Sequence, residues 1–165
     1  MTLLAEQILI DCPPARLEAL LGHPPSWMTP LLRLAGDEGE AAGLAVLGEG
    51  AAADRRRPTR GRAHHAELRR IGPAGGNHRV ALRWQAAGYR VLFSELDGTI
   101  QVRPMADRTV LSIEGAYAPP RGRGSTTRPV ARRRAAETAA RSLLGHLRSA
   151  VEQERSGVEV VHLHQ

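Results

Sequence analysis

The chain has 165 residues, a length that suits one folded domain with a sizeable core. Its 42% hydrophobic and 24% charged residues are ordinary for a globular protein, and no stretch approaches the roughly 20 apolar residues that cross a bilayer. Glu6 and Asp11 interrupt the first apolar segment, so we expect no secretory leader. The single cysteine, Cys12, excludes an internal disulfide and favours a reducing compartment, so we expect a cytoplasmic protein.

The net charge is +6, and all 23 basic residues are arginine. Absence of lysine beside abundant alanine and glycine is typical of a high-GC genome. Clusters such as Arg55–Arg57 and Arg132–Arg134 therefore carry less functional weight, and a solvated arginine-rich face is the favoured interpretation. Such a surface still attracts phosphates, but few aromatic residues are available to stack on bases, so nucleic acid is not the expected partner.

The first half of the chain predicts one strand followed by a helical interruption. Thr2–Cys12 is apolar and stops at a proline pair, as a strand does. We expect two short helices next, at Ala15–Leu21 and at Ser26–Ala35, with Ser26 as the cap of the second. The remaining expected elements are a brief strand at Gly43–Gly48, a loop at Gly50–Gly61 and a strand at Arg62–Ile71.

From His78 to Tyr117 the pattern predicts four short strands. Apolar side chains alternate from Val80 to Ala86, as in a half-buried strand. Asp97–Gly98 predicts a tight two-residue turn, because both residues accept a positive φ. Connections this short need no parallel crossover, so we expect an antiparallel sheet. The later strands would be Val91–Leu96, Thr99–Met105 and Thr109–Tyr117.

The clearest amphipathic pattern lies at Val130–Gln153, where apolar residues recur at helical spacing. Ser156–Gly157 predicts the end of this helix. We therefore expect one domain over residues 1–155 and a C-terminal tail over residues 156–165.

This order of elements resembles the START-like (SRPBCC) superfamily, which includes polyketide cyclases, lipid-transfer domains and birch-pollen-allergen-like proteins. The local text resembles uncharacterised bacterial members at Leu82–Ala86, Leu92–Gly98 and Gly115–Gly122, where a strand leaves through a Tyr-x-Pro-Pro-x-Gly loop into the last helix. The resemblance implies an α+β helix-grip fold. In it, a curved antiparallel sheet of about six or seven strands wraps around a long C-terminal helix, with two short helices after the first strand.

The resemblance also implies a cavity between the sheet and the C-terminal helix, used by family members for hydrophobic or amphiphilic small molecules. A strongly curved sheet cannot lie flush against one straight helix, and this chain has few large aromatic side chains to fill the gap. A filled core is the alternative, because protein interiors are close-packed. The residues expected to line the cavity are Trp27, Leu31, Phe93, Glu95, Leu111, Ile113, Tyr117, Leu143 and Leu147.

Two of these residues are candidates for catalysis. Glu95 interrupts an apolar strand, and a carboxylate facing an apolar cavity can serve as acid, base or ligand anchor. An ion pair with Arg83 or Arg103 is the alternative for Glu95. The hydroxyl of Tyr117 would either enter the cavity or cap the following loop. Glu114 is on the opposite face of its strand from Tyr117 and is expected to face solvent.

Neither a metal nor a cofactor is expected. His64 and His65 are adjacent on a strand and point to opposite faces, while His162 and His164 lack cysteine or carboxylate support. We favour a non-enzymatic protein that binds a small hydrophobic or amphiphilic molecule. The alternatives are a cofactor-free enzyme of cyclase or hydratase type that uses a pocket carboxylate, and an arginine-rich interaction protein that contacts an acidic partner or nucleic acid. The oligomeric state is not predicted.

Overall fold

The computed structural model describes residues 2–22, 28–47, 65–71, 78–85, 92, 95–118 and 129–161. Within these ranges, the chain forms one five-stranded antiparallel sheet and three helices. The strands are β1 (Thr2–Ile10), β2 (His65–Ile71), β3 (His78–Gln85), β4 (Glu95–Met105) and β5 (Arg108–Ala118), and the helices are α1 (Pro14–Gly22), α2 (Met28–Leu47) and α3 (Pro129–Val161).

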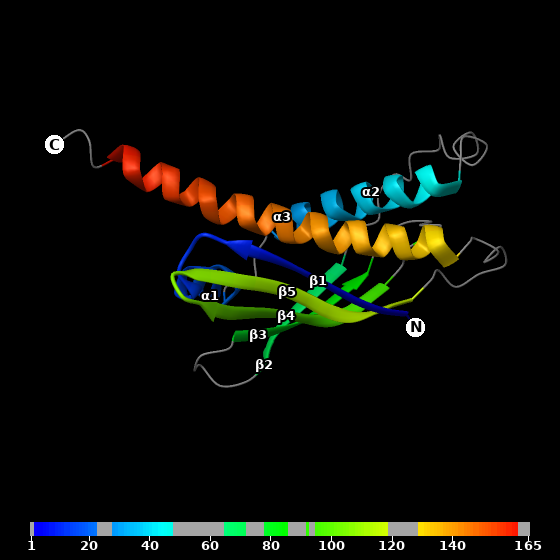
Figure 1. Ribbon diagram of the computed structural model, residues 1–165, viewed down its shortest axis with the longest axis horizontal. Helices are drawn as coiled ribbons and strands as arrows, with labels where there is room; N and C mark the ends of the chain where they lie inside the picture. Colours follow the sequence, from blue (N-terminus) through cyan, green and yellow to red (C-terminus); the bar gives the residue numbers. More distant parts are fainter. Residues whose placement is uncertain are drawn as a thin grey trace.

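The sheet has the order β1-β5-β4-β3-β2, and the long helix α3 runs over one of its faces (Figure 1). This arrangement confirms the predicted α+β helix-grip class, with a curved antiparallel sheet against a long C-terminal helix. The described sheet has five strands rather than six or seven. None of the helices in the described part of the chain combines the length and the apolar character needed to cross a bilayer.

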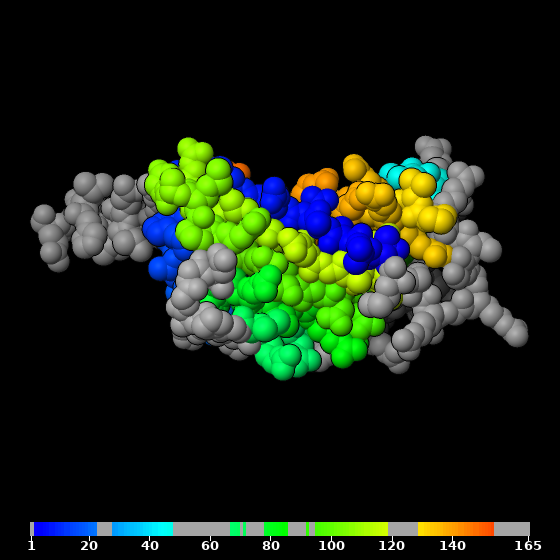
Figure 2. All heavy atoms as spheres, turned by 60° about the horizontal axis from the view of Figure 1, so that its bottom comes forward, coloured from blue at the N-terminus to red at the C-terminus, as the bar shows by residue number. Residues whose placement is uncertain are grey.

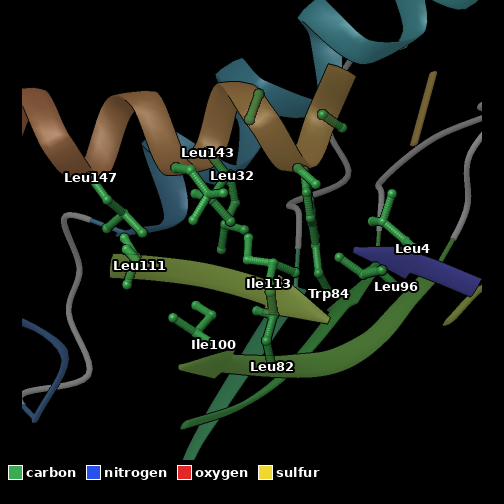
Figure 3. Packing of buried hydrophobic residues seen from close by; sticks show 14 of the residues in the cluster. Leu4, Leu32, Leu82, Trp84, Leu96, Ile100, Leu111, Ile113, Leu143 and Leu147 are labelled. Carbon is green, nitrogen blue, oxygen red and sulfur yellow. The ribbon is translucent and has the colours of Figure 1, made fainter. Parts of the chain in front are cut away.

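Cross-strand pairing gives the sheet one apolar face, which we call the inner face. One row across three strands contains Tyr117, Leu96 and Trp84, and all three side chains are buried. Ile113 and Ile100 form another buried pair on this face, four residues along β5 and β4 from Tyr117 and Leu96. Because side chains alternate along a strand, the intervening residues lie on the opposite, outer face. Figure 3 shows the inner-face side chains pointing toward α3 and α2.

The alternation predicted for β3 is confirmed, since buried and exposed or half-buried residues alternate from His78 to Gln85. A tight turn joins β4 to β5, in the gap between the expected strands Thr99–Met105 and Thr109–Tyr117. Met105 pairs with Arg108 across a two-residue turn, and Ala106 in that turn has a φ of 55°. That turn fixes which residues of β5 face the helices.

Helix α2 is the largest departure from the sequence prediction. A short helix ending at Ala35 and a strand at Gly43–Gly48 were expected, but one 20-residue helix extends through Leu47. Small residues mislead here because the buried side of this helix is small from Ala35 onward, at Ala35, Gly36, Gly39 and Gly43. A Cβ on Gly43 would lie 2.7 Å from the carbonyl oxygen of Ala131, so the two helix backbones approach closely.

Two further predictions were wrong. Asp97–Gly98 does not form a turn, since β4 is continuous from Glu95 to Met105. Gly98 instead pairs with Gly115 on β5, and a Cβ on Gly98 would lie 2.6 Å from the carbonyl oxygen of Glu114. Glycine is needed there for close strand approach and not for a positive φ. Helix α3 also continues past Ser156–Gly157 to Val161, because glycine lowers helix stability without forcing an end.

Candidate functional site

Five of the predicted cavity-lining residues come together in the core between the sheet and α3. Leu111 and Ile113 belong to β5 and are fully buried, and Tyr117 near the end of the same strand is 3% exposed. Leu143 and Leu147 approach from α3, and Figure 3 shows Leu147 close to Leu111. These side chains belong to one continuous apolar cluster.

The other predicted lining residues lie elsewhere. Leu31 of α2 is half-buried at the margin of the cluster, whereas its neighbour Leu32 is fully buried beside Leu143 (Figure 3). Trp27 and Phe93 lie outside the described residues. The core therefore combines side chains of the sheet, α3 and α2, and α2 contributes more to it than the sequence indicated.

Glu95 lies on the outer face, away from this cluster. Its Oε1 accepts hydrogen bonds from Nε and Nη2 of Arg83, each at 3.1 Å. The Arg83 side chain is 56% exposed and the Glu95 side chain 28% exposed. This is the ion pair that the sequence analysis gave as the alternative to a pocket carboxylate. Glu114 is exposed on the same face, as predicted, and accepts a hydrogen bond from Gln101 at 3.3 Å.

His78 is a buried polar residue that the sequence analysis did not single out. It begins β3 on the inner face and is 4% exposed. Its Nε2 atom has no hydrogen-bond partner among the residues that the structure describes. His78 pairs with Val102, which pairs in turn with Leu111, so its imidazole lies in the same cross-strand row as a predicted lining residue. Its position two residues before Val80 in an alternating strand is the signal that could have identified it.

The end of the core near α1 is fixed by a buried hydrogen bond. Thr109 Oγ1 donates to the carbonyl oxygen of Cys12 at 2.6 Å, and both residues are buried. Burial raises the pKa of the Cys12 thiol, so this thiol stays protonated and weakly reactive at neutral pH. Cys12 therefore packs in the core as a small apolar side chain.

Glu6 is the acidic residue of β1 that shares its pleat with the buried Leu4 and Ile10. Its carboxylate pairs with Arg141 of α3, with Arg141 Nη2 donating to Glu6 Oε1 at 2.7 Å. The pair ties α3 to the edge strand of the sheet. In the described ranges, no three histidine, cysteine, aspartate or glutamate side chains are grouped so that they could hold a metal ion.

A family model described as polyketide cyclase / dehydrase and lipid transport matches residues 1–152. No curated protein matches the chain. Among solved structures, the protein TTHA0849 from Thermus thermophilus has 14% identity and a TM-score of 0.43, and the match covers 90% of this chain and 99% of that one. The protein Mll3558 from Rhizobium loti has 14% identity and a TM-score of 0.29, with 86% of this chain and 96% of that one covered.

Proposed function

The chain belongs to the polyketide cyclase / dehydrase and lipid transport family, and from this membership we propose that it binds a small hydrophobic or amphiphilic molecule between the inner face of the sheet and α3. The observation that carries the proposal is the chemistry of this region. The sheet and α3 meet through apolar side chains of one cluster, and the buried Nε2 of His78 has no partner in the described part of the chain. Small-molecule sites have this pattern of an apolar lining with few polar groups that orient the ligand.

Apolar burial supplies the driving force for binding at this site. A guest that buries about 200 Å² of apolar surface gains roughly 5 kcal/mol before the cost of association, at about 25 cal/mol per Å². Leu111, Ile113, Leu143 and Leu147 are each 0% exposed and belong to one cluster, so a guest enters by parting these side chains. A polar group on the guest then reaches Nε2 of His78 and orients the molecule.

A cofactor-free reaction of cyclase or hydratase type is the second candidate function. The observation in its favour is again His78, a titratable side chain buried on the inner face. Glu95 is paired with Arg83 on the outer face, and Glu6 is paired with Arg141. His78 is therefore the residue to replace in a test of catalysis. Turnover of a candidate substrate that survives in a His78→Phe variant would exclude this imidazole as the acid or base.

We further propose that the protein is cytoplasmic. The support is its single cysteine, which is buried, and the absence of any internal disulfide that would favour an oxidising compartment.

The binding proposal is tested with N-phenyl-1-naphthylamine, a neutral apolar fluorophore whose emission rises when it leaves water. We expect saturable binding to the wild-type protein. Ile113→Phe adds volume to the inner wall and is expected to weaken binding about tenfold, since overpacking a closed site costs roughly 1–3 kcal/mol. Leu9→Phe is the matched control, because Leu9 lies on the outer face of β1 and is 38% exposed.

Circular dichroism of each variant separates loss of binding from loss of folding. A folded Ile113→Phe protein that binds the fluorophore as tightly as the Leu9→Phe protein would refute the inner site. A wild-type protein that leaves the emission unchanged at every concentration would refute binding of a neutral apolar guest altogether.

A further inference from the structure

The outer face of the sheet carries a hollow of about 600 Å³ that the proposed function does not use. It crosses the sheet diagonally, from Leu3 and Ala5 on β1 to Arg79 on β3 and Ile71 on β2. Figure 2 looks toward this side of the molecule, where β1 and β5 lie beside each other and α3 is seen at the upper edge. The hollow has the size of sites that hold small molecules, which span roughly 300–1,000 Å³.

The shape follows from the side chains of one cross-strand row. Ala5, Glu114 and Thr99 are paired across β1, β5 and β4, so two of the three residues in the row are small. Longer side chains stand at the two ends of the hollow. Leu3 is 86% exposed at one end and Ile71 is 40% exposed at the other, which provides apolar surface for a ligand.

The β4–β3–β2 end of this face carries charges of both signs, with Glu67 and Asp97 across from Arg83, and with Arg79 nearer to the hollow. Arg79 pairs with Gln101 on β4 and with Ile71 on β2, so Arg103 and Arg69 are its diagonal neighbours, roughly 7–8 Å away. All three arginines are exposed, and none forms an ion pair with a residue of the described chain. Arg83, on the same face, is neutralised by Glu95. Of these three arginines, Arg79 lines the hollow, and Arg69 and Arg103 lie beside it on the neighbouring strands.

The part of the hollow nearer to β1 contains a negative charge, the carboxylate of Glu114. Glu114 lies in the hollow and its Oε2 accepts a hydrogen bond from Gln101 Nε2. A bound anion is repelled by this carboxylate and attracted by Arg79, so the electrostatics orient an anionic ligand with its charge toward β3. The apolar surface of Ala5 and Leu3 remains for the rest of the molecule.

We propose that this hollow is a second binding site, for a free small molecule that joins a phosphate or carboxylate to an apolar body. The anionic group pairs with the guanidinium of Arg79, whose planar donors match both oxyanions. The apolar body lies over Ala5 and ends on Leu3. The site is on the opposite side of the sheet from the inner face, so it can be occupied independently of the proposed inner guest.

Phenyl phosphate is a suitable probe, because it carries a phosphate and one aromatic ring. We expect saturable shifts of the backbone amide NMR signals of Arg79, Thr99, Gln101 and Glu114 during titration of the ¹⁵N-labelled protein. Arg79→Gln should weaken binding about tenfold, the effect expected from one charge-assisted contact. Arg134→Gln is the matched control, since Arg134 is an exposed arginine on α3 and its replacement removes the same charge elsewhere.

Further arms of the experiment identify the ligand class. Inorganic phosphate should bind more weakly than phenyl phosphate, because it lacks the apolar body, and added salt should weaken both. An equal loss of affinity in the Arg79→Gln and Arg134→Gln proteins would show a general charge effect and overturn the proposal. Shifts of the same amides with protein concentration alone would indicate a second copy of the chain and overturn it. Binding to phosphatidylglycerol vesicles without binding of free phenyl phosphate would do the same.

Discussion

Thr109 and Cys12 connect the start of β5 to the segment that follows β1, and their hydrogen bond is buried. The Cys12 carbonyl has lost access to water, so the hydroxyl of Thr109 provides its compensation. Single buried contacts of this kind hold the first and last strands in register near α1. They are features of individual residues, and sequence patterns of apolar and polar residues do not reveal them.

Replacing Thr109 with valine keeps the shape of the side chain and removes the donor. We expect the free energy of unfolding to fall by about 1–3 kcal/mol, because the carbonyl is left unsatisfied. Thr109→Ser retains the hydroxyl and should lose about 1 kcal/mol for the missing methyl group. Chemical denaturation measures both values, and a Thr109→Val protein as stable as the wild type would contradict the role given to this bond.

Cys12 makes stability depend on pH in the alkaline range. Burial raises the pKa of its thiol above the ordinary value of 9.0, so between the two pKa values the folded state binds more protons than the unfolded state. Its contribution is complete below pH 9 and is lost as the pH rises through the folded-state pKa. Urea denaturation of the wild type and of Cys12→Ala, from about pH 8 to about pH 10.5, should show a steeper decline for the wild type. An equal decline of stability with pH in the two proteins would refute the contribution assigned to the Cys12 thiol.

The ion pair between Glu95 and Arg83 is exposed and should contribute little. We expect Glu95→Gln to change the free energy of unfolding by less than about 1 kcal/mol, the range for surface pairs. Binding of N-phenyl-1-naphthylamine should also be unchanged, since Glu95 lies on the outer face. Much weaker fluorophore binding by the Glu95→Gln protein would contradict the outer-face position of Glu95 and indicate that its carboxylate contacts the bound molecule.

At the scale of elements, strong local sequence patterns predicted strands and helices well, but the packing between helices could not be predicted. Alternation located β3, the proline pair marked the passage from β1 to α1, which begins at Pro14, and the 3.6-residue period located α3. Helix α2 was truncated in the prediction because Gly39 and Gly43 weaken the helical pattern, although they allow contact with α3. Asp97–Gly98 predicts a turn from sequence alone, because the contact of Gly98 with Gly115 is a tertiary feature. Whether a glycine ends an element or allows close packing depends on its tertiary neighbours, which the local sequence does not reveal.

The contact between α2 and α3 can be tested at Gly39, where a Cβ would collide with the carbonyl oxygen of Ala135 and the Cβ of Ala139. We expect Gly39→Ala to lower the free energy of unfolding by about 1–3 kcal/mol through overpacking. Gly145→Ala is the control, because no atom lies within 4 Å of the added Cβ. That variant should gain roughly 0.5–1 kcal/mol from helix propensity. Thermal or urea unfolding compares the two, and equal gains would exclude the close helix contact.

At the scale of the whole molecule, the sheet separates two chemically different faces. The inner face is apolar and covered by helices, whereas the outer face mixes exposed apolar side chains with polar ones, including three arginines that lack ion-pair partners among the described residues. Strand parity predicted this division, including the outward position of Glu114. The sequence offered Arg83 as one possible partner of Glu95, and the structure contains that pair. The partner of Glu6 could not be predicted, because Arg141 reaches it only through the placement of α3 over β1. The arginine content of the sequence likewise did not indicate which cations would remain uncompensated.

We propose above that a small apolar molecule binds between the inner face of the sheet and α3. Native mass spectrometry of protein purified from its own host tests it most directly. We expect the wild type and Leu9→Phe to retain a small organic molecule as an added mass, and Ile113→Phe to lack it. An added mass retained equally by a folded Ile113→Phe protein, or a wild type that carries none, would contradict the claim.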